Sequence, residues 1–236
     1  MAQENELRHV AVILDGNGRW AKQHGVERRE GHLAGANRVV DFMNYISRYD
    51  SIRYVTLYAF STENWKRSKD EVDALMNILA QFLDDNLEVL LKEKVRLLTA
   101  GDITALPEAC QVRLEKVKRE TAKSFTRTFI LALNYGSRRE ITDAVKSIAA
   151  EVKNGTLAVD DITEQTVADH LYTPDVPDPD LLIRTSGEER ISNFLLWQIS
   201  YSEFYFTKTL WPDFDINEFD LAVQAFYGRK RRFGGR

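Results

Sequence analysis

The sequence predicts a single α/β domain built on a six-stranded, mostly parallel sheet that is flanked by helices. Six short apolar runs alternate along the chain with longer stretches of helical periodicity, and this alternation is typical of parallel sheets buried on both faces. The chain has 236 residues, of which 44% are hydrophobic and 29% are charged, which is enough to bury one full-sized core. No Pro/Gly-rich linker and no internal repeat divides it, so residues 1–236 are taken as one domain.

The continuous apolar runs are the predicted strands, because a strand covered by helices on both sides presents no polar face. In chain order they are Val10–Leu14, Tyr54–Phe60, Val95–Thr99, Thr128–Leu133, Leu181–Arg184 and Glu203–Thr207. The predicted helices lie at about 33–49, 69–93, 108–123, 138–153, 163–172 and 216–231. Residues 1–8 are expected to form a flexible N-terminus, and residues 229–236 a basic C-terminal tail.

The predicted helix over residues 69–93 has the clearest pattern. Its apolar residues recur from Val72 onward at intervals of three, four and seven, which places them on one face of an amphipathic helix. Ser68 followed by Glu71 matches a capping box at its start. The acidic stretch at 84–88 resembles an aspartate-rich diphosphate motif, but it has no second copy, so we interpret it as a solvated helix face.

Composition argues against several classes of function. The net charge is −4, and residues 229–236 hold five of the 32 basic groups, so the acidic remainder does not favour a nucleic-acid binder. One cysteine, Cys110, cannot form an internal disulfide, and the acidic N-terminus lacks a secretory signal pattern. We therefore expect a cytoplasmic protein, and contact with the inner face of the membrane stays open. Four scattered histidines give no zinc-ligand spacing, and no run reaches the ~18 apolar residues that span a bilayer.

Polar residues cluster directly after four of the predicted strands. The clusters are Asp15-Gly-Asn-Gly, Ser61-Thr-Glu-Asn, Asn134-Tyr-Gly and Arg184-Thr-Ser-Gly. Ligands of open parallel sheets bind at the carboxyl ends of the strands, so we predict one shared site at this edge. For any single cluster, ordinary turn chemistry is the alternative.

The first cluster predicts a diphosphate site that includes a divalent cation. Gly16-x-Gly18-x-x-Ala21 formally matches a dinucleotide fingerprint, but a helical run stands where the acidic residue about 20 positions further on belongs. The Asp15 carboxylate would repel a pyrophosphate unless a cation lay between them, and Mg²⁺ binds one or two carboxylates together with phosphate oxygens. A tight turn in which Asp15 caps the next helix is the alternative.

Arginines form the second candidate constellation, because guanidinium groups bind phosphate oxygens bidentately. Arg184 and Arg190 flank a Ser-Gly turn and are followed by Ser192 and Asn193, which predicts a donor-rich pocket. Arg38 lies inside a predicted helix, where a salt bridge is favoured over a ligand contact. The other arginines near these loops are Arg19, Arg28 and Arg67. The chain has no Walker lysine, no Gly-x-Ser-x-Gly elbow and no kinase motif set.

Together these motifs resemble the cis-prenyltransferases, and most closely the bacterial undecaprenyl diphosphate synthases. The resemblance runs from His9 to Gly235 in ordered blocks. The blocks are HVAVILDGNGRWA, Arg28-x-x-Gly31-His32, TLYAFSTENWKR at 56–67, ALNYGSR at 132–138, DLLIRTSGEERISNFLLWQISYSEFYF at 180–206, LWPDF at 210–214 and RRFGG at 231–235. The resemblance implies a homodimer whose sheet and helices enclose a hydrophobic tunnel. It also implies successive condensation of isopentenyl diphosphate onto an allylic diphosphate such as farnesyl diphosphate, with Mg²⁺ and with cis double bonds in the product.

The resemblance also implies roles for individual residues. Positions at the reacting groups are Asp15, His32, Ser61 and Asn64, and the group that takes the proton stays open. Positions that bind substrate are Gly16, Asn17, Gly18, Arg19, Trp20, Arg28, His32, Ser61, Glu63, Asn64, Trp65, Arg67, Arg184, Arg190, Ser192, Arg232 and Gly234. In this set Arg184, Arg190 and Ser192 match the isopentenyl diphosphate site. The expected metal positions are Asp15 and Glu203.

Two departures from the family pattern and three alternatives remain. Ser68 stands where the family usually has proline, and Ser137 where it usually has a second glycine, which puts only that turn's backbone geometry in doubt. The expected product is undecaprenyl diphosphate, the lipid carrier precursor for cell-wall synthesis. A shorter-chain synthase and a non-catalytic partner subunit are the main alternatives, and a nicotinamide oxidoreductase is the third. The intact Asp15 and Arg184 positions favour an active homomer.

Overall fold

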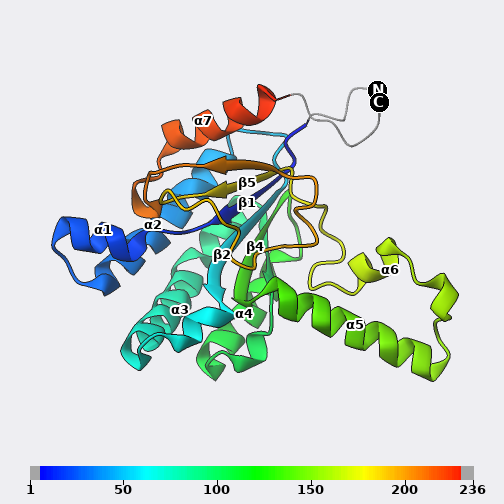
Figure 1. Cartoon of the computed structure of the whole chain (residues 1–236). Helices are drawn as coiled ribbons and strands as arrows, with labels where there is room; N and C mark the ends of the chain where they lie inside the picture. Colours follow the sequence, from blue (N-terminus) through cyan, green and yellow to red (C-terminus); the bar gives the residue numbers. More distant parts are fainter. Residues whose placement is uncertain (1–5, 230–236) are drawn as a thin grey trace.

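One sheet of six parallel strands organises the protein, which a computed structural model describes over residues 6–229 (Figure 1). The strand order across the sheet is β3-β4-β2-β1-β5-β6, and every neighbouring pair is parallel. The strands are β1 (His9–Ile13), β2 (Tyr54–Ser61), β3 (Val95–Ala100), β4 (Arg127–Tyr135), β5 (Leu181–Arg184) and β6 (Glu203–Phe206). All six predicted strands are confirmed, and no strand end differs from its predicted position by more than two residues.

The helices agree with the predicted segments except near the N-terminus and at the ends of the last two helices, α6 and α7, which end three and four residues before the predicted positions 172 and 231. They are α1 (Asn17–His24), α2 (Arg28–Ile46), α3 (Lys69–Lys92), α4 (Glu108–Thr121), α5 (Ser137–Asn154), α6 (Glu164–Asp169) and α7 (Ile216–Tyr227). Short 3₁₀ turns follow as η1 (Thr62–Lys66), η2 (Ile103–Ala105), η3 (Val159–Asp161) and η4 (Trp211–Asp213). The sequence did not predict α1, because Ala21 is its one buried residue and it therefore has no apolar stripe. It also placed the start of α2 one turn too late, since the first residues of α2 are polar.

The two faces of the sheet are covered differently. Buried side chains of α2, α3, α4 and α7 pack on one face in a large core that includes Phe42, Leu83 and Trp211. On the other face, a smaller cluster around Tyr135 and Phe194 packs beneath the chain that joins β5 to β6. Helices α5 and α6 extend away from the body as an arm (Figure 1). The apolar strand runs therefore do mark strands that are covered on both faces.

Helix α3 bears out most of what its sequence pattern indicated. Ser68 is the N-cap, and its side chain accepts a hydrogen bond from the Glu71 amide at 3.4 Å. The acids of the 84–88 stretch are exposed, and Asp84 pairs with Arg113 at 2.7 Å, so this stretch is a solvated face. The capping box is only half formed, because the Glu71 carboxylate points to other partners.

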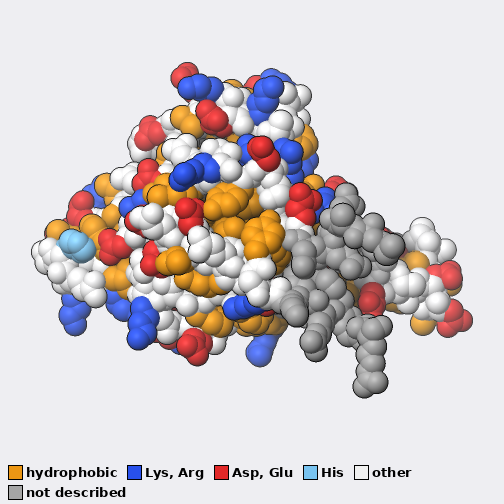
Figure 2. All heavy atoms as spheres, turned by 90° about the horizontal axis from the view of Figure 1, so that it is seen from above, with side chains coloured by type: hydrophobic (Ala, Val, Ile, Leu, Met, Phe, Trp, Pro, Cys, Tyr) orange, Lys and Arg blue, Asp and Glu red, His pale blue; other side chains and the backbone are white. Residues whose placement is uncertain are grey.

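The chain ends bear on two expectations. Leu7 is fully buried and the Arg8 amide donates to Asp180 at 2.8 Å, so these two residues of the segment expected to be flexible are part of the fold. Residues 1–5 and most of the basic tail, including Arg232 and Gly234, lie outside the described residues. Seen from above, the face that carries α7 mixes hydrophobic with charged side chains (Figure 2), and Leu221 and Tyr227 of α7 are half exposed. Among residues 6–229 there is no helix whose length and apolarity would allow it to cross a membrane.

Candidate active site

A large cleft opens at the carboxyl edge of the sheet. Its volume is about 1000 Å³, and residues that follow β1, β2 and β5 line it. Three of the four predicted polar clusters therefore meet, represented by Asp15, Ser61 and Arg184. The fourth cluster does not line the cleft. The Asn134 side chain instead accepts a hydrogen bond from the Trp65 indole and donates one to the Asp102 carbonyl.

The cleft carries a surplus of positive charge. Of the described residues that line it, six are basic and two are acidic. The basic ones are Arg19, Lys22, Arg28, Arg67, Arg184 and Arg190, and the acidic ones are Asp15 and Glu63. A cleft lined by one sign of charge concentrates ligands of the opposite sign, so this arrangement suits a polyanion.

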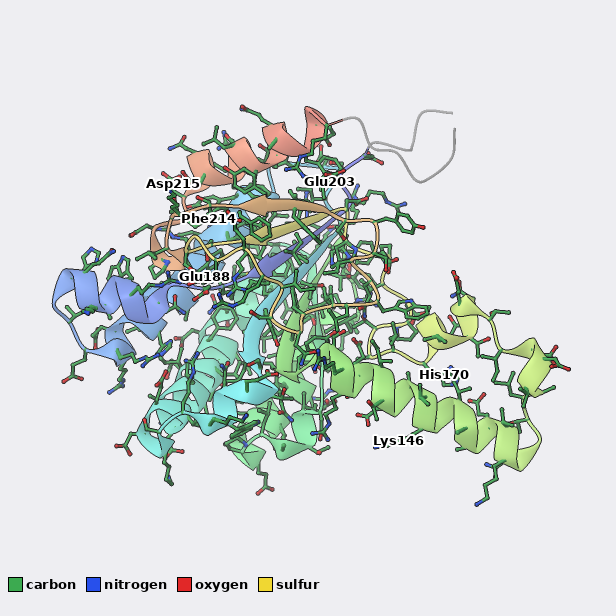
Figure 3. All side chains as sticks on the ribbon, in the orientation of Figure 1. Lys146, His170, Glu188, Glu203, Phe214 and Asp215 are labelled. Atoms are coloured by element: carbon green, nitrogen blue, oxygen red, sulfur yellow. The ribbon has the colours of Figure 1, made fainter. Side chains whose placement is uncertain are left out.

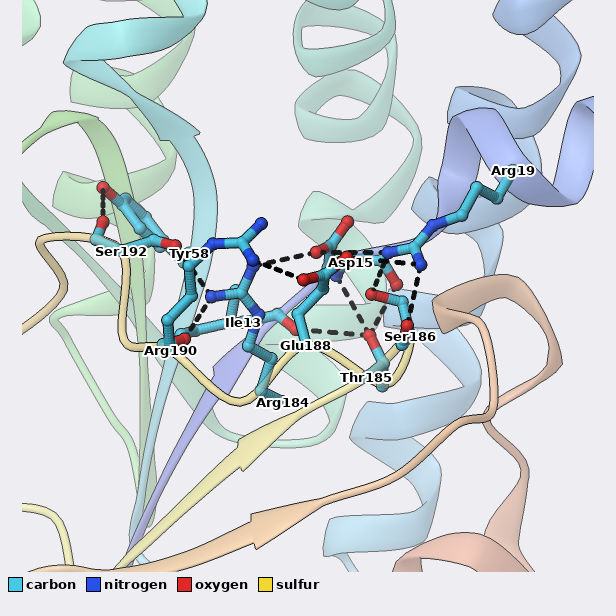
Figure 4. Close-up of polar contacts among 10 residues, drawn as sticks. All are labelled: Ile13, Asp15, Arg19, Tyr58, Arg184, Thr185, Ser186, Glu188, Arg190 and Ser192. Atoms are coloured by element: carbon cyan, nitrogen blue, oxygen red, sulfur yellow. Dashed lines mark hydrogen bonds and ion pairs between the residues drawn. The ribbon is translucent and has the colours of Figure 1, made fainter.

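Asp15 lies between two arginines at the floor of the cleft (Figure 4). Its Oδ2 is 2.9 Å from Arg184 Nη2 and 3.6 Å from Arg19 Nη2. Burial acts to raise the pKa of Asp15, but hydrogen bonds from Arg184 and Ser186 outweigh it and hold this pKa below its usual value. The carboxylate is therefore ionised at neutral pH.

The turn after β1 aims Asp15 into the cleft. Gly16 is the N-cap of α1 with φ of 117°, a left-handed conformation that favours glycine, and a Cβ there would lie 3.0 Å from Leu210 atoms. No side chain caps α1, which removes the alternative that Asp15 serves as a helix cap. The Asp15 backbone amide instead donates to the Ile13 carbonyl at 2.9 Å and to the Thr185 hydroxyl at 3.0 Å.

Arg184 is the most firmly held cation in the cleft. Its side chain is 4% exposed, and it donates to the Ser192 hydroxyl at 2.7 Å and to the Arg190 carbonyl (Figure 4). Arg190 itself is exposed and pairs with Glu188. The structure brings Arg184, Arg190 and Ser192 together at the cleft, with Arg184 at the centre of this group.

The loop after β5 is shaped by backbone strain and by a neighbouring glycine. Ser192 and Asn193 have φ of 47° and 62°, which non-glycine residues rarely adopt. A Cβ at Gly136, in the turn after β4, would lie 2.8 Å from the side chains of Asn193 and Thr62, so a larger residue there would displace them. Ser137, the departure from the family pattern, starts α5 and accepts a hydrogen bond from the Leu196 amide at 2.7 Å. That turn therefore accommodates serine and anchors the loop.

The opposite wall of the cleft comes from α2 and from the turn after β2. His32 is 7% exposed, and burial lowers its pKa although a hydrogen bond to Glu71 acts to raise it. Asn64, in η1, accepts a hydrogen bond from the backbone amide of Ser61 at 3.0 Å, which fixes the Asn64 side chain against the end of β2. Asn17 Oδ1 is buried and has no hydrogen-bond partner among the described residues.

An apolar cavity of about 110 Å³ adjoins this wall, between the sheet and helices α2 and α3. Its deeper lining includes Phe60, Leu79, Phe82 and Trp211. Five residues line both the cavity and the cleft, so the two are continuous: Leu14, Asn17, His32, Ala59 and Leu75. The cavity lies where the resemblance places a hydrophobic tunnel.

A family model described as "Putative undecaprenyl diphosphate synthase" matches residues 13–234. The chain belongs to this family. It is 48% identical over 228 residues to an isoprenyl transferase of Thermotoga maritima, with 97% of each chain covered. It is 46% identical to a farnesyl-diphosphate-specific ditrans,polycis-undecaprenyl-diphosphate synthase of Micrococcus luteus, over 97% of this chain and 91% of that one.

A solved structure gives the same result. Lavandulyl diphosphate synthase from Lavandula x intermedia, in complex with dimethylallyl diphosphate, matches with a TM-score of 0.95 and 40% identity, covering 99% of this chain and 100% of that one. The protein is therefore a prenyltransferase of the undecaprenyl diphosphate synthase family, with the fold that its sequence predicts, and the nicotinamide oxidoreductase alternative is wrong.

Several residues that this prenyltransferase family implies do not reach the cleft. Trp20 donates to Asp213 at 2.7 Å and Trp65 to Asn134 at 2.8 Å, and neither is among the lining residues. Glu203 begins β6 and pairs with Arg229 at 2.7 Å. Because β6 is parallel to its neighbour β5, Glu203 lies at the amino edge, at the other end of the strands from Glu188 (Figure 3). Within one chain, Asp15 and Glu203 therefore cannot share a metal ion.

The donor set fits a magnesium ion that is shared with a substrate. The described residues contain no group of three or more His, Cys, Asp or Glu side chains placed to hold a metal. Asp15 offers one ionised carboxylate, 31% exposed, at the floor of a cationic cleft. Mg²⁺ commonly binds through one or two carboxylates plus phosphate oxygens, so Asp15 suits such an ion when a diphosphate is bound.

Two residues of the site were missed by sequence reasoning. Glu71 binds Arg28, His32 and Arg67, yet its position three residues after Ser68 indicated a capping box. Tyr58 lines the cleft and its hydroxyl donates to the Ser192 carbonyl at 3.3 Å, although its apolar strand context indicated only core packing. Arg38 is correctly predicted, since it pairs with Asp41 at 3.0 Å.

Proposed function

We propose that this prenyltransferase condenses isopentenyl diphosphate successively onto an allylic diphosphate, with farnesyl diphosphate as the primer. The product is a long-chain cis-polyprenyl diphosphate, undecaprenyl diphosphate, which serves as the lipid carrier precursor for cell-wall synthesis. The observation that carries this proposal is the continuity of the cationic cleft with the apolar cavity. One substrate needs both environments, because its diphosphate is charged and its isoprenoid chain is apolar.

The allylic diphosphate occupies the wall around Asp15. The amides and side chains of Gly16 to Arg19, together with Arg28 and Arg67, contact its phosphate oxygens, as helix N-termini and guanidinium groups do. A magnesium ion held by Asp15 would neutralise the diphosphate and assist its departure. The apolar cavity excludes water from the positive charge that develops on the allylic carbon.

Isopentenyl diphosphate binds on the side of Arg184, Arg190 and Ser192. Arg184 is fixed before the substrate arrives, since its side chain is buried and hydrogen-bonded. Such preorganised donors hold the double bond at attack distance from the allylic carbon. His32, Ser61 and Asn64 line the cleft near the cavity mouth, where the proton leaves after condensation.

A homodimer and the basic tail complete this proposal. In the family an Arg-x-Gly near the C-terminus reaches the partner's isopentenyl diphosphate, and Arg232 and Gly234 match it. Deletion of residues 232–236 is expected to raise the Michaelis constant for isopentenyl diphosphate in detergent solution while the dimer persists. Activity that falls only with anionic membranes would identify the tail as a lipid contact instead.

A shorter product is the second candidate. The apolar cavity measures about 110 Å³, and its lining includes the bulky side chains of Phe82, Leu131 and Trp211. The lavandulyl diphosphate synthase, with its TM-score of 0.95, holds dimethylallyl diphosphate. These two observations are the reason to keep a short-chain product as the second candidate.

One assay separates these functions. The protein is incubated with labelled isopentenyl diphosphate, Mg²⁺ and either farnesyl or dimethylallyl diphosphate, and the products are sized. Undecaprenyl diphosphate from the farnesyl primer supports the long-chain synthase, and a shorter product supports the second candidate. No product with either primer would contradict both and leave a non-catalytic subunit.

A further inference from the structure

A basic face lies at the amino ends of β2, β3 and β4. It comprises residues 47–53, 91–96 and 122–127, which hold seven basic and two acidic side chains. Its local charge is therefore +5, in a chain whose net charge is −4. The basic residues are Arg48, Arg53, Lys92, Lys94, Arg96, Lys123 and Arg127, and the acidic ones are Asp50 and Glu93.

Hydrogen bonds join the three segments into one surface. The Thr126 amide donates to the Lys94 carbonyl at 2.8 Å, and the Arg53 guanidinium donates to the Thr126 carbonyl at 3.5 Å. The Arg127 guanidinium donates to the Ser47 carbonyl at 3.4 Å. Strands β3, β4 and β2 are neighbours in the sheet, so the segments that precede them lie side by side.

Most of the charge on the basic face is not neutralised within the described part of the chain. Of its seven basic residues, only Lys123 and Arg127 form ion pairs among residues 6–229, with Glu120 and Asp50. The buried polar groups at the amino end of β1 bond one another, but most of these charges face solvent. Four of the remaining basic residues are exposed: Arg48, Arg53, Lys92 and Lys94.

Two large apolar side chains stand among these charges. Leu91 is 43% exposed and Phe125 is 42% exposed. The Lys94 amide donates to the Leu91 carbonyl at 3.2 Å, and the Arg96 guanidinium lies 4.1 Å from the centre of the Phe125 ring. Helices α2, α3 and α4 end at this face, and helix C-termini attract positive charge. That attraction explains basic residues here, but it does not explain an exposed leucine and an exposed phenylalanine.

The apolar cavity leads toward the basic face. A second, smaller cavity of about 20 Å³ has Met43, Phe129 and Arg127 among its lining residues. Met43 comes one turn after Val39 on α2, and Phe129 comes two residues before Leu131 on β4; Val39 and Leu131 line the apolar cavity. The two cavities therefore follow one another between the sheet and helices α2 and α3, and the smaller one borders the basic face.

We propose that the basic face docks on a membrane surface that carries anionic lipids. Its basic side chains contact the lipid phosphates, and Leu91 and Phe125 enter the headgroup region, where apolar side chains leave water. Docking in this orientation sets the amino-edge end of the two cavities against lipid, an environment that suits an isoprenoid chain. That consequence rests on the proposed function, but the docking itself does not.

Two double variants test the charge of the basic face. Lys92→Gln/Lys94→Gln removes two of its exposed charges, and Lys146→Gln/Lys153→Gln, on α5, is the control with the same net charge. Sedimentation with phosphatidylcholine vesicles, with and without an equal share of phosphatidylglycerol, measures binding. We expect the wild type to bind the anionic vesicles. Lys92→Gln/Lys94→Gln should bind them about 10-fold more weakly, as the loss of two charges near an anionic surface predicts, and the control should bind within about 2-fold of the wild type.

A third variant separates a lipid surface from other polyanions. Leu91→Ser/Phe125→Ser keeps every charge and removes the apolar side chains, so its binding to the anionic vesicles should fall about 5-fold or more. A nucleic acid or an acidic protein would be held by the charges alone. If this variant binds the vesicles as tightly as the wild type, the basic face is a general polyanion surface and the proposal is overturned.

Turnover in detergent and the melting temperature show that each variant is folded, because none of the substituted residues lines the cleft. A wild type that does not bind anionic vesicles, or equal losses in the two lysine variants, would overturn the proposal. So would a protein that loses binding on deletion of residues 232–236 while Lys92→Gln/Lys94→Gln binds normally, since the tail would then be the lipid contact. Vesicle binding is measured without substrate, so its outcome is independent of whether the protein forms a polyprenyl product.

Discussion

The two edges of the sheet contain similar polar residues in opposite situations. At the amino edge, the His9 ring bonds the Pro177 carbonyl at 2.6 Å and Thr56 at 2.8 Å, and Asp180 accepts the amides of Arg8 and His9. At the carboxyl edge, Asp15 and Arg184 also bond each other, but they face a cleft of about 1000 Å³. One edge has polar groups that satisfy each other, and the other has polar groups with capacity left for a ligand.

Unused hydrogen-bonding capacity is one feature of the site, and it also occurs outside the cleft, at Arg127 Nε and Gln198 Oε1. Arg184 Nε and Asn17 Oδ1 are buried and lack partners among the described residues, and both residues line the cleft. Buried polar atoms without partners cost free energy, and a ligand in the cleft would supply partners for Arg184 Nε and Asn17 Oδ1. At the amino edge both nitrogens of His9 are already bonded. Substitutions at the two edges should therefore affect different quantities: turnover at the carboxyl edge and stability at the amino edge.

The largest effect is expected for Asp15→Ala. Removal of this carboxylate should lower turnover by about 10²-fold or more, the scale for losing a group that acts in the transition state. The melting temperature should change little, because the Asp15 side chain lies in the open cleft. The control is Asp84→Ala, an exposed acid of the stretch that resembles a diphosphate motif. Turnover of Asp15→Ala at the wild-type rate with saturating Mg²⁺ would refute the metal role.

The second effect is expected for Arg184→Lys. Lysine cannot reproduce the forked contacts of this buried guanidinium, so the Michaelis constant for isopentenyl diphosphate should rise by a factor that corresponds to about 1.5–3 kcal/mol. The constant for the allylic substrate should rise much less. Steady-state kinetics with each substrate varied in turn measures both, and Arg113→Lys, a surface pair with Asp84, is the control. Equal losses for the two substrates would mean that they do not use separate pockets.

The third effect concerns the amino edge and depends on pH. Burial lowers the pKa of His9 from 6.5 to about 4, although the Pro177 and Asp180 contacts act to raise it. The unfolded chain then binds a proton between these two values and the folded chain does not, so stability falls as the pH drops through this window. Between pH 7 and 5.5 the loss should be about 1 kcal/mol.

Urea unfolding at both pH values measures this loss. In His9→Gln the part of the pH dependence that belongs to His9 should disappear, while turnover at pH 7 stays close to that of the wild type. A variant with the full pH dependence of the wild type would show that His9 is not the titrating group. A variant that keeps its stability and loses turnover would break the contrast between the two edges.

The sequence was sufficient for the strands and for the residues at strand ends. Continuous apolar runs identify strands that are covered on both faces, and the end of a run then places Asp15 and Arg184 at one edge. Periodicity does not predict where a polar side chain points. Glu71 and His32 are 39 residues apart in sequence and meet only through the packing of α2 against α3. Helix α1 was missed for a related reason, because it buries almost nothing.

Direction along a strand explains why Glu203 lies away from the cleft within one chain. Glu203 lies in a motif that suggested a site residue, but it begins its strand, whereas Arg184 ends the neighbouring one. Parallel strands carry these two positions to opposite edges. Trp20 and Trp65 follow strands at the correct edge, but their indole N–H groups bond Asp213 and Asn134 outside the cleft lining.

The smallest effect is expected for Arg28→Lys, which compares two cations of the same cleft. Arg28 is 61% exposed, whereas Arg184 is 4% exposed, and Arg28 is held through Nε by Glu71. An exposed cation loses side-chain entropy when it binds and is screened by water, so its contact is worth about 0–1 kcal/mol. Lysine keeps the charge, and we expect the Michaelis constant for the allylic substrate to rise less than about 5-fold.

Kinetics at low and high salt test this assignment of Arg28. Added salt should weaken binding of the allylic substrate to the wild type, because exposed charges are screened within about 10 Å at 0.1 M. It should also reduce the difference in the Michaelis constant for this substrate between the wild type and Arg28→Lys. The defect of Arg184→Lys should persist in salt, because that side chain is buried. If Arg28→Lys were as damaging as Arg184→Lys, the exposed cation would have to become buried when the substrate binds. The wall of α2 would then close over the allylic diphosphate, and both walls of the cleft would hold their substrates through fixed contacts.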